Sequence, residues 1–209
     1  MGAPILACVK KNIPDIFMDC HMMVSKPSQD EAGEFVSGAG AGAGYRASNG
    51  ELHGYRCANA QWVKDVAEAG GKLYTFHLEA AKEDAKAVID LIHSHGMLAG
   101  VAISPETPAS AITDEIGNAA DHLLVMTVRP GYGGQKFMPE CLPKCTELRA
   151  RFPDKNIQVD GGVGAGNACQ CGKAGANVLV AGTAVFGSKD PRQTIKEMRT
   201  AVDEGEEAK

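Results

Sequence analysis

The chain of 209 residues lacks any apolar run near the roughly 20 residues that a membrane-spanning helix requires. It also lacks an N-terminal basic stretch followed by an apolar one, the pattern of a secretory signal. Positive charge is not in excess, since the net charge is −5 and the isoelectric point is about 5.7. These absences argue against membranes and nucleic acids as partners, and we expect a cytoplasmic protein.

Cysteines are present, but the spacing that would make them metal ligands is missing. There are seven, an odd number, and without a secretory signal we expect them to be reduced thiols. Cys169 and Cys171 form one close pair, and Cys141 and Cys145 form another. Neither pair has a matching partner of zinc-ligand spacing, and both fall in helix-like stretches, so we predict that they serve packing.

Short strand-like segments alternate with helix-like ones in a chain that is 44% hydrophobic. This apolar content supports a substantial core, and the length suits a single domain over residues 1–209. The predicted strands are Ile16–Val24, Leu73–Leu78, Leu98–Ile103, His122–Val128, Ile157–Val159 and Val178–Ala181. The predicted helices are Gln61–Ala69, Glu83–His95, Ala109–Ala119, Pro139–Phe152, Ala168–Ala174 and Pro191–Asp203.

Strands such as "HLLVMTV" and "NVLVAG" are apolar at both odd and even positions, which is typical of parallel strands covered on both faces. Repeated βα units of this kind predict either a (β/α) barrel or a doubly wound sheet. Six strands are visible where a complete barrel has eight. Residues 30–60 break the alternation with a Gly-Ala-rich stretch, and we predict a flexible inserted segment there.

The stretch "IQVDGGVG" places Asp160 at the end of a strand, with Gly161 and Gly162 directly after it. One interpretation is a turn that needs positive φ at the glycines, with the aspartate as its cap. The other is a reaction centre, in which a carboxylate handles a proton or a metal beside bare amides that a phosphate can approach. The stretch alone leaves both open.

In "FMDCHMMV", Asp19, His21 and Met23 alternate along a strand and therefore face the same way. An aspartate and a histidine in an apolar strand are costly to bury unless they are paired or coordinated. For a lone histidine the structural interpretation, a hydrogen-bonded core residue, is the commoner one. Together with Asp160 at another strand end, however, His21 becomes a candidate ligand of one divalent ion.

Glycine-flanked strand ends also occur in the last βα units. "VMTVRPGYGGQKF" leads from a strand into Gly131, Gly133 and Gly134, and "VAGTAVFGSKDP" ends the last strand at Gly182 and Thr183. In barrels of this type the ends of the last strands commonly form a phosphate site. We therefore predict a phosphate cradle there. "YTFHLEA" offers His77 and Glu79 at a further strand end, and a supporting or structural role is predicted for them.

Five motifs, in order, resemble the ribulose-phosphate 3-epimerase family of the pentose phosphate pathway. They are "DCHMMVSKP", "YTFHLEA", "VMTVRPGYGGQKFMP", "VDGGVG" and "VAGTAVF". The resemblance covers nearly everything except residues 30–60. It implies an α/β fold, the TIM (β/α)₈ barrel of the ribulose-phosphate-binding type. It also implies an isomerase that interconverts D-ribulose 5-phosphate and D-xylulose 5-phosphate through an enediolate formed at C3.

The resemblance also implies residue roles. Asp160 is a catalytic acid/base and a metal ligand, and His21 is a second ligand of one divalent ion, which is Zn, Fe, Mn or Co. Met23 and Met126 shield the enediolate from water. The implied substrate and phosphate contacts are His21, Gly131, Tyr132, Gly133, Gly134, Asp160, Gly161, Gly162, Gly182 and Thr183.

The chain departs from the family pattern at two places. Family members begin with a strand carrying a serine, a helix, and a strand with an H-x-D pair that supplies the other metal ligands and the second acid/base. "MGAPILACVKK" resembles the helix after that second strand, so we expect about the first two βα units to be lacking. Residues 30–60 fall between "SKPSQ" and "QWV", which the family joins through a single glutamine.

The sequence therefore leaves three functional hypotheses. The first is the epimerase, with weak turnover expected from this chain alone and with a homodimer compatible with the resemblance. The second is a non-catalytic sugar-phosphate binder that retains only the cradle. The third is a decarboxylase or synthase on the same fold, which would need a lysine at a strand end. Lys136 and Lys173 fall instead in a loop and a helix, which argues against the third.

Overall fold

The computed structural model describes residues 3–23, 62–81, 85–129 and 135–208. Within these ranges, six parallel strands form one sheet in the order of the sequence, β1-β2-β3-β4-β5-β6. The strands are β1 (Asp19–Met22), β2 (Leu73–His77), β3 (Leu98–Ile103), β4 (His122–Met126), β5 (Asn156–Asp160) and β6 (Val178–Val180). None of the described helices is long and apolar enough to cross a bilayer.

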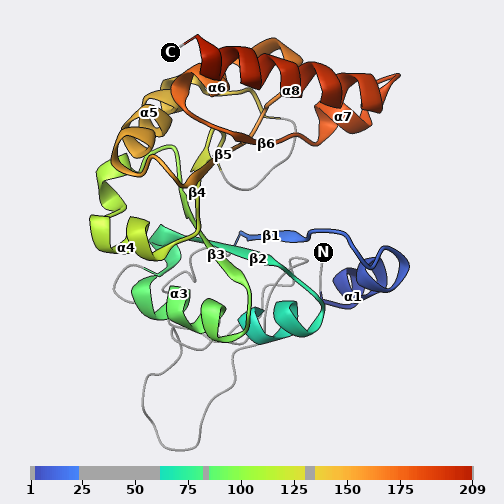
Figure 1. The fold of residues 1–209 in the computed structure, drawn as a ribbon, viewed down its shortest axis with the longest axis vertical. Helices are drawn as coiled ribbons and strands as arrows, with labels where there is room; N and C mark the ends of the chain where they lie inside the picture. Colours follow the sequence, from blue (N-terminus) through green and yellow to red (C-terminus); the bar gives the residue numbers. More distant parts are fainter. Residues whose placement is uncertain (1–2, 24–61, 82–84, 130–134, 209) are drawn as a thin grey trace, which may run out of the picture.

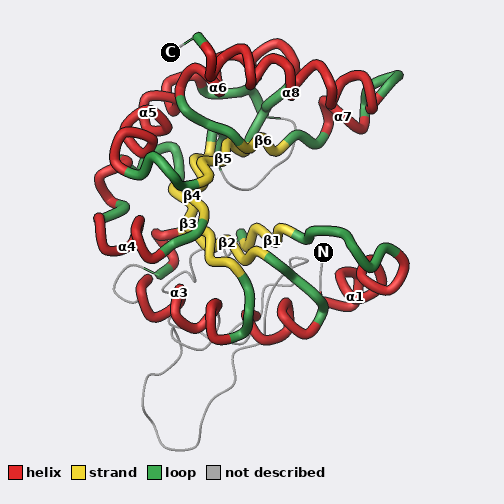
Figure 2. The backbone as a smooth tube through the Cα atoms, in the orientation of Figure 1, coloured by secondary structure: helices red, strands yellow, loops and turns green. Residues whose placement is uncertain are grey.

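Helices connect the strands and lie along the outside of the curled sheet (Figures 1 and 2). The α-helices are α1 (Ala3–Asn12), an unlabelled helix over 62–68, α3 (Ala85–Ser94), α4 (Asp114–Ala119), α5 (Leu142–Arg151), α6 (Ala165–Ala174), α7 (Thr183–Phe186) and α8 (Pro191–Glu207). The 3₁₀ turns are η1 (Leu78–Ala80), η2 (Ala109–Ala111) and η3 (Pro139–Cys141).

The strand order decides between the two folds that the sequence left open. A doubly wound sheet reverses its order at a switch point, whereas each strand of a barrel pairs with the next one in the sequence. Here every described strand pairs in parallel with its successor, and the sheet curls with helices on its convex side (Figure 2). The fold is α/β, with the arrangement of a partial TIM barrel, as predicted.

All six predicted strands are present, with boundaries that differ by a few residues at most. The largest difference among the helices concerns 109–119, which is not one helix. Thr113 is extended and its Oγ1 accepts a hydrogen bond from the Ile116 amide, so a new helix, α4, begins after it. The predicted insertion over residues 30–60 lies outside the described residues.

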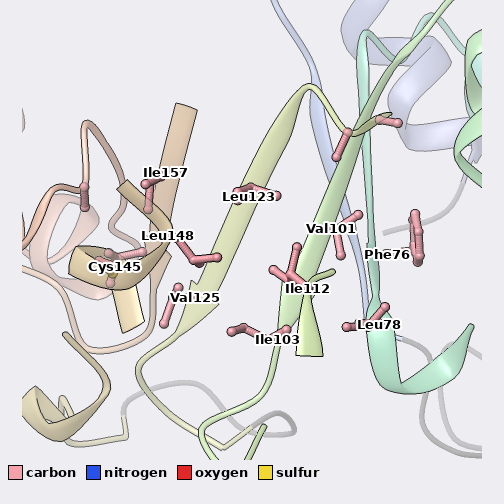
Figure 3. Close-up of a cluster of buried hydrophobic side chains, with 14 of the residues drawn as sticks. Phe76, Leu78, Val101, Ile103, Ile112, Leu123, Val125, Cys145, Leu148 and Ile157 are labelled. Carbon is pink, nitrogen blue, oxygen red and sulfur yellow. The ribbon is translucent and has the colours of Figure 1, made fainter. Parts of the chain in front are cut away.

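The outer face of the sheet carries the main hydrophobic core. Because side chains alternate along a strand, each strand sends one set of apolar residues toward the helices. Figure 3 shows this layer, where side chains from β2 to β5 meet those of α5 and the segment before α4. Its labelled members are Phe76, Leu78, Val101, Ile103, Ile112, Leu123, Val125, Cys145, Leu148 and Ile157. This layer holds the strands in place and fixes where their carboxyl ends lie.

The inner face of the sheet differs in chemistry. It has a small apolar cluster of Ala102, Leu124, Met126 and Val128 beside polar residues of several strands. The register places His21 opposite Thr75, and Met126 opposite Asp160. Polar side chains of β1, β2, β4 and β5 thus face the interior of the curl, the side on which barrel enzymes build their sites.

Helices α6 and α8 approach closely because glycines face each other's backbones. A Cβ on Gly172 would lie 2.5 Å from the carbonyl oxygen of Val202, and one on Gly205 would lie 2.6 Å from that of Cys169. Neither glycine is in the left-handed region, so it is the space between the helices that requires them. The close contact between α6 and α8 covers the end of the hydrophobic core near β5 and β6.

We predict that Gly172→Ala lowers the free energy of unfolding by about 1–3 kcal/mol, because the added methyl must push α8 away. The matched control is Gly166→Ala in the same helix, where a Cβ would meet no atom within 4 Å. The control is expected to keep or slightly raise stability, since alanine is the better helix former by up to about 1 kcal/mol. Urea unfolding of both variants measures the difference, and equal midpoints would contradict the packing argument.

Candidate active site

Two side chains that are far apart in the sequence meet inside the curl. His21 stands on β1 and Asp160 ends β5, and three strands lie between β1 and β5 in the sheet. His21 Nδ1 lies 3.2 Å from Asp160 Oδ2, and the two side chains are 13% and 19% exposed. The sequence predicted that these two residues act together, and the structure places them in contact.

A second histidine extends this pair toward β2. His77 Nε2 lies 2.9 Å from His21 Nε2, and the two rings stack with centroids 5.0 Å apart and an interplanar angle of 20°. On the other side of its ring, His77 Nδ1 lies 3.4 Å from Glu79 Oε2. Four side chains from three strand ends therefore form a continuous chain, Asp160–His21–His77–Glu79.

Glu79 is held as an anion at the end of this chain. Its Oε1 accepts hydrogen bonds from the Ser104 amide, at 2.8 Å, and from the Thr107 hydroxyl. Burial alone would raise the pKa of Glu79, but hydrogen bonds from His77, Thr107 and Ser104 outweigh it and lower the pKa to about 2. The carboxylate thus keeps its charge at neutral pH and ties η1 to the loop after β3.

A deeper polar layer lies toward the amino ends of the strands. His122 Nε2 donates to Gln158 Oε1 at 2.5 Å, and Gln158 Nε2 donates to Asp19 Oδ2 at 3.1 Å. Burial lowers the pKa of His122, which favours the neutral ring, against the opposing effect of Gln158. The Asp19 carboxylate is therefore hydrogen-bonded to Gln158, one layer below the His21–Asp160 contact.

The glycines after Asp160 meet the demand of the turn interpretation. Gly161 has φ +125° and Gly162 has φ +66°, values that side chains disfavour. A Cβ on Gly161 would also lie 2.4 Å from Val128, and one on Gly162 would lie 2.6 Å from the Phe137 amide nitrogen. Thr127 Oγ1 donates to the Gly161 carbonyl at 2.7 Å. The turn needs glycine at both positions, and it also places Gly162 at the edge of a pocket.

That pocket has a volume of about 350 Å³ and lies at the carboxyl ends of β5 and β6. Its lining is Gln135, Gly162, Val163, Gly164, Gly166, Asn167, Thr183 and Ala184. Asn167 fixes its rim, because Asn167 Oδ1 accepts from the Gly164 amide at 2.9 Å and Asn167 Nδ2 donates to the Gly162 carbonyl at 3.1 Å. Of the residues predicted for the phosphate cradle, Gly162 and Thr183 line this pocket.

The remaining predicted residues fall into three groups. Gly182 precedes Thr183 at the pocket, and a Cβ on it would meet no atom within 4 Å, so neither packing nor a positive φ requires a glycine there. Met126 is buried in the inner apolar cluster, whereas Met23 is 52% exposed just after β1. Gly131, Tyr132, Gly133 and Gly134 lie outside the described residues.

The donor atoms for a divalent ion are present only in part. A histidine nitrogen and a carboxylate oxygen 3.2 Å apart are suitable ligand types for the transition metals considered above. Within the described ranges, however, no group of three or more histidine, cysteine or acidic side chains is arranged to hold an ion. Cys141, Cys145 and Cys171 are buried in the main hydrophobic core, and burial raises the pKa of each thiol, whereas Cys169 is half-buried.

Sequence reasoning missed Asn167, Gln158 and His122. A signal existed for Asn167, which stands three residues after Gly164, the N-cap of α6, a usual place for a helix-capping contact. No signal marked Gln158 and His122, because a polar residue in a strand does not reveal its partner on another strand. His77 and Glu79 were recognised at a strand end, but their contact with His21 was not.

The comparisons with known proteins agree with this geometry. The family model described as "Ribulose-phosphate 3 epimerase family" matches residues 53–186. A protein named ribulose-phosphate 3-epimerase from Candida glabrata is 41% identical over 189 residues, which are 90% of this chain and 63% of that protein. The cytoplasmic isoform from Oryza sativa is 34% identical over 205 residues, covering 97% and 75% of the two chains.

Among solved structures, the chain is similar to 3-keto-L-gulonate-6-phosphate decarboxylase from Vibrio cholerae, with a TM-score of 0.65. The alignment covers 96% of this chain and 78% of that one, and at 13% identity it bears on the fold alone. This chain thus spans between 63% and 75% of the length of the two relatives above. From the matching family model and these identities, the chain belongs to the ribulose-phosphate 3-epimerase family.

Proposed function

We propose that this chain acts on a pentulose 5-phosphate and interconverts D-ribulose 5-phosphate and D-xylulose 5-phosphate by moving the proton at C3. The observation that carries the proposal is the position of Asp160. Its carboxylate contacts His21 at the carboxyl ends of β5 and β1, and two residues later Gly162 lines the pocket that suits a phosphate. A proton acceptor and an anion site are thus adjacent, as a sugar phosphate requires.

The chemistry assigns Asp160 to one face of the sugar. The C3 hydrogen is acidic because it lies beside the C2 carbonyl, and its removal by the Asp160 carboxylate gives an enediolate. Return of a proton to the same face regenerates the starting sugar, so epimerisation needs a second acid on the opposite face. Buried Met126, paired in register with Asp160, lies on the inner apolar surface and excludes water from this side.

The described residues do not offer a well-placed second acid for the opposite face of the sugar. Asp19 faces the same interior, but it lies two residues deeper in β1 and its Oδ2 accepts a hydrogen bond from Gln158. No other aspartate or glutamate is found on the inner face of the described strands. One positioned acid/base contributes about 10²–10⁴-fold. We therefore expect slow turnover from these residues alone.

A divalent ion belongs to the proposal as well. His21 and Asp160 are the residues that would hold it, and its charge would stabilise the enediolate oxygens. The described part of the chain supplies these two ligand side chains and no third one in reach. We accordingly expect weak binding from this part of the site.

Two alternatives make different demands on the same residues. A sugar-phosphate binder would use the pocket at Gly162 and Thr183 without needing Asp160 as a base. A decarboxylase or synthase on the same fold would need a lysine at the carboxyl end of a strand, and β1 to β6 contain no lysine. The epimerase proposal is the one that gives Asp160 a chemical role.

We also propose that the protein works in the cytoplasm as a homodimer. The rice relative is named a cytoplasmic isoform, which supports the first part. Phe186 on α7 is 86% exposed and Ile195 on α8 is also exposed. An apolar contact between two copies would cover such side chains.

The first functional prediction concerns Asp160. Asp160→Asn keeps the size of the side chain but removes the base, so conversion of D-ribulose 5-phosphate should fall by about 10²–10⁴-fold. A coupled assay for D-xylulose 5-phosphate measures it, with Asp203→Asn on the exposed face of α8 as control. Wild-type turnover that survives Asp160→Asn would refute the assigned role. Ribulose 5-phosphate binding without turnover in the wild type would favour the binder.

The second concerns the pocket. Gly182→Val places a side chain in the open space beside Thr183, so binding of D-ribulose 5-phosphate should weaken at least tenfold while the melting temperature stays the same. Thr183→Val, which removes only the hydroxyl, should weaken binding less. Calorimetry measures both affinities. Unchanged affinity in Gly182→Val would place the phosphate elsewhere.

The third concerns metal content. With two ligand side chains instead of a full set, the purified chain should carry clearly less than one divalent ion, and His21→Ala should remove most of what remains. Elemental analysis after dialysis measures the ratio. A ratio near one that persists in His21→Ala would show that the ion is held by other residues.

A further inference from the structure

Asn167 joins the turn after β5 to the first turn of α6. Its Oδ1 accepts a hydrogen bond from the Gly164 amide at 2.9 Å, and its Nδ2 donates to the Gly162 carbonyl at 3.1 Å. The two contacts allow only one orientation of the side-chain amide, because a backbone N–H needs the oxygen and a backbone carbonyl needs the nitrogen. One side chain thus holds the backbone on both sides of Val163.

The segment that Asn167 holds is rich in glycine. In "GGVG" three of four residues lack a side chain, and glycine loses more conformational freedom on folding than any other residue. Peptide groups are planar, so the contact with the Gly162 carbonyl also fixes the direction of the Val163 N–H. In the same way, the contact with the Gly164 N–H fixes the Val163 carbonyl. Asn167 therefore sets both peptide planes between Gly162 and Gly164.

The segment set by Asn167 forms one wall of the pocket at the carboxyl ends of β5 and β6. Gly162, Val163 and Gly164 all line this pocket, and so does Asn167 itself. The Gly164 amide already donates to Asn167 Oδ1, so it serves the shape of the wall rather than the binding of an anion. The backbone donors for an anion must come from elsewhere in the wall.

The first turn of α6 offers such donors. The amides of Asn167 and Ala168 donate to the Gly164 carbonyl, at 3.2 and 3.1 Å. Ala165 and Gly166 begin the helix, and the first amides of a helix have no partner within it. Gly166 lines the pocket, and a Cβ on it would meet no atom within 4 Å. The position of these amides depends on how Asn167 holds the start of the helix.

We propose that Asn167 is a positioning residue for the phosphate pocket, which it serves by fixing the Gly162–Gly164 backbone at the start of α6. The proposal rests on the proposed function for phosphate as the ligand of this pocket. A backbone that is fixed in advance loses less conformational entropy when the ligand binds, so the affinity is higher. Phosphate is bound alike in substrate and transition state, so this effect acts on KM rather than on kcat.

The decisive test measures the binding of inorganic phosphate and of D-ribulose 5-phosphate by calorimetry. Asn167→Ala removes both contacts, and both ligands should bind about 3–10-fold more weakly, as expected from losing one or two backbone hydrogen bonds that fix the pocket. Equal affinities in Asn167→Ala and the wild type would overturn the proposal.

Asn177→Ala is the matched control. Asn177 also holds backbone with its side chain, since its Oδ1 accepts from the Ile157 amide at 2.8 Å, but it does so at the amino end of β5. The control should lower the melting temperature and leave both affinities unchanged. If Asn177→Ala weakened binding as much as Asn167→Ala, general destabilisation would be the cause and the positioning role would be refuted.

Hydrogen exchange of the backbone amides reads the contact itself. The Gly164 amide should be protected in the wild type and should exchange about tenfold faster or more in Asn167→Ala, because its acceptor is gone. The Ile157 amide, which is held by Asn177, should keep its rate in this variant. An unchanged rate at Gly164 would show that Asn167 does not hold the segment, and would contradict the proposal.

Kinetics separates this proposal from the proposed function. In a chain that turns over, Asn167→Ala should raise KM about 3–10-fold with little change in kcat, whereas Asp160→Asn lowers kcat. A fall in kcat with KM unchanged would refute the positioning role. Phosphate binding that weakens in Asn167→Ala, in a chain without turnover, would support that role and refute only the proposed function. A wild-type chain that binds neither ligand would refute the roles of both Asn167 and the pocket.

Discussion

The contact between His21 and Asp160 joins strands that are not neighbours in the sheet. Three strands separate β1 from β5, so the two side chains meet only because the sheet curls. A second contact between the same two strands, from Gln158 to Asp19, lies one layer deeper. Curvature, site geometry and the placement of the polar inner face therefore depend on one another. A flatter sheet would separate the acid/base candidate from its partner and leave both polar groups unpaired.

The elements themselves were predictable from local chemistry. Runs such as "HLLVMTV" are apolar at every position because helices cover one face and the interior covers the other, and this pattern identified the strands. Asp160 and His21 could be paired in advance because both end or interrupt apolar strands of a fold that gathers its strand ends. The helix over 109–119 was wrongly continued, because the hydrogen bond of Thr113 that restarts it competes with ordinary helix propensity.

The polar contacts behind the site were not predictable in the same way. Whether His77 meets His21, or His122 meets Gln158, depends on strand register and curl, which alternation within one strand does not encode. The glycines show the same limit. Gly161 and Gly162 were attributed to a turn or to a phosphate, yet contacts with Val128 and Phe137, which only the folded chain brings near, restrict them equally.

The order of the strands has a consequence for how the protein assembles. Strands β2 to β5 each pair with the next strand in the sequence, so their contacts close short stretches of chain and can form early. The contacts of β1 with β5 span 139 residues, and closing so long an interval carries a larger entropic cost. The contacts of β1 with β5 are thus the ones in this site with the largest entropic cost of closure. Transient release of this strand would take His21 away from Asp160 while the remaining five strands stay folded.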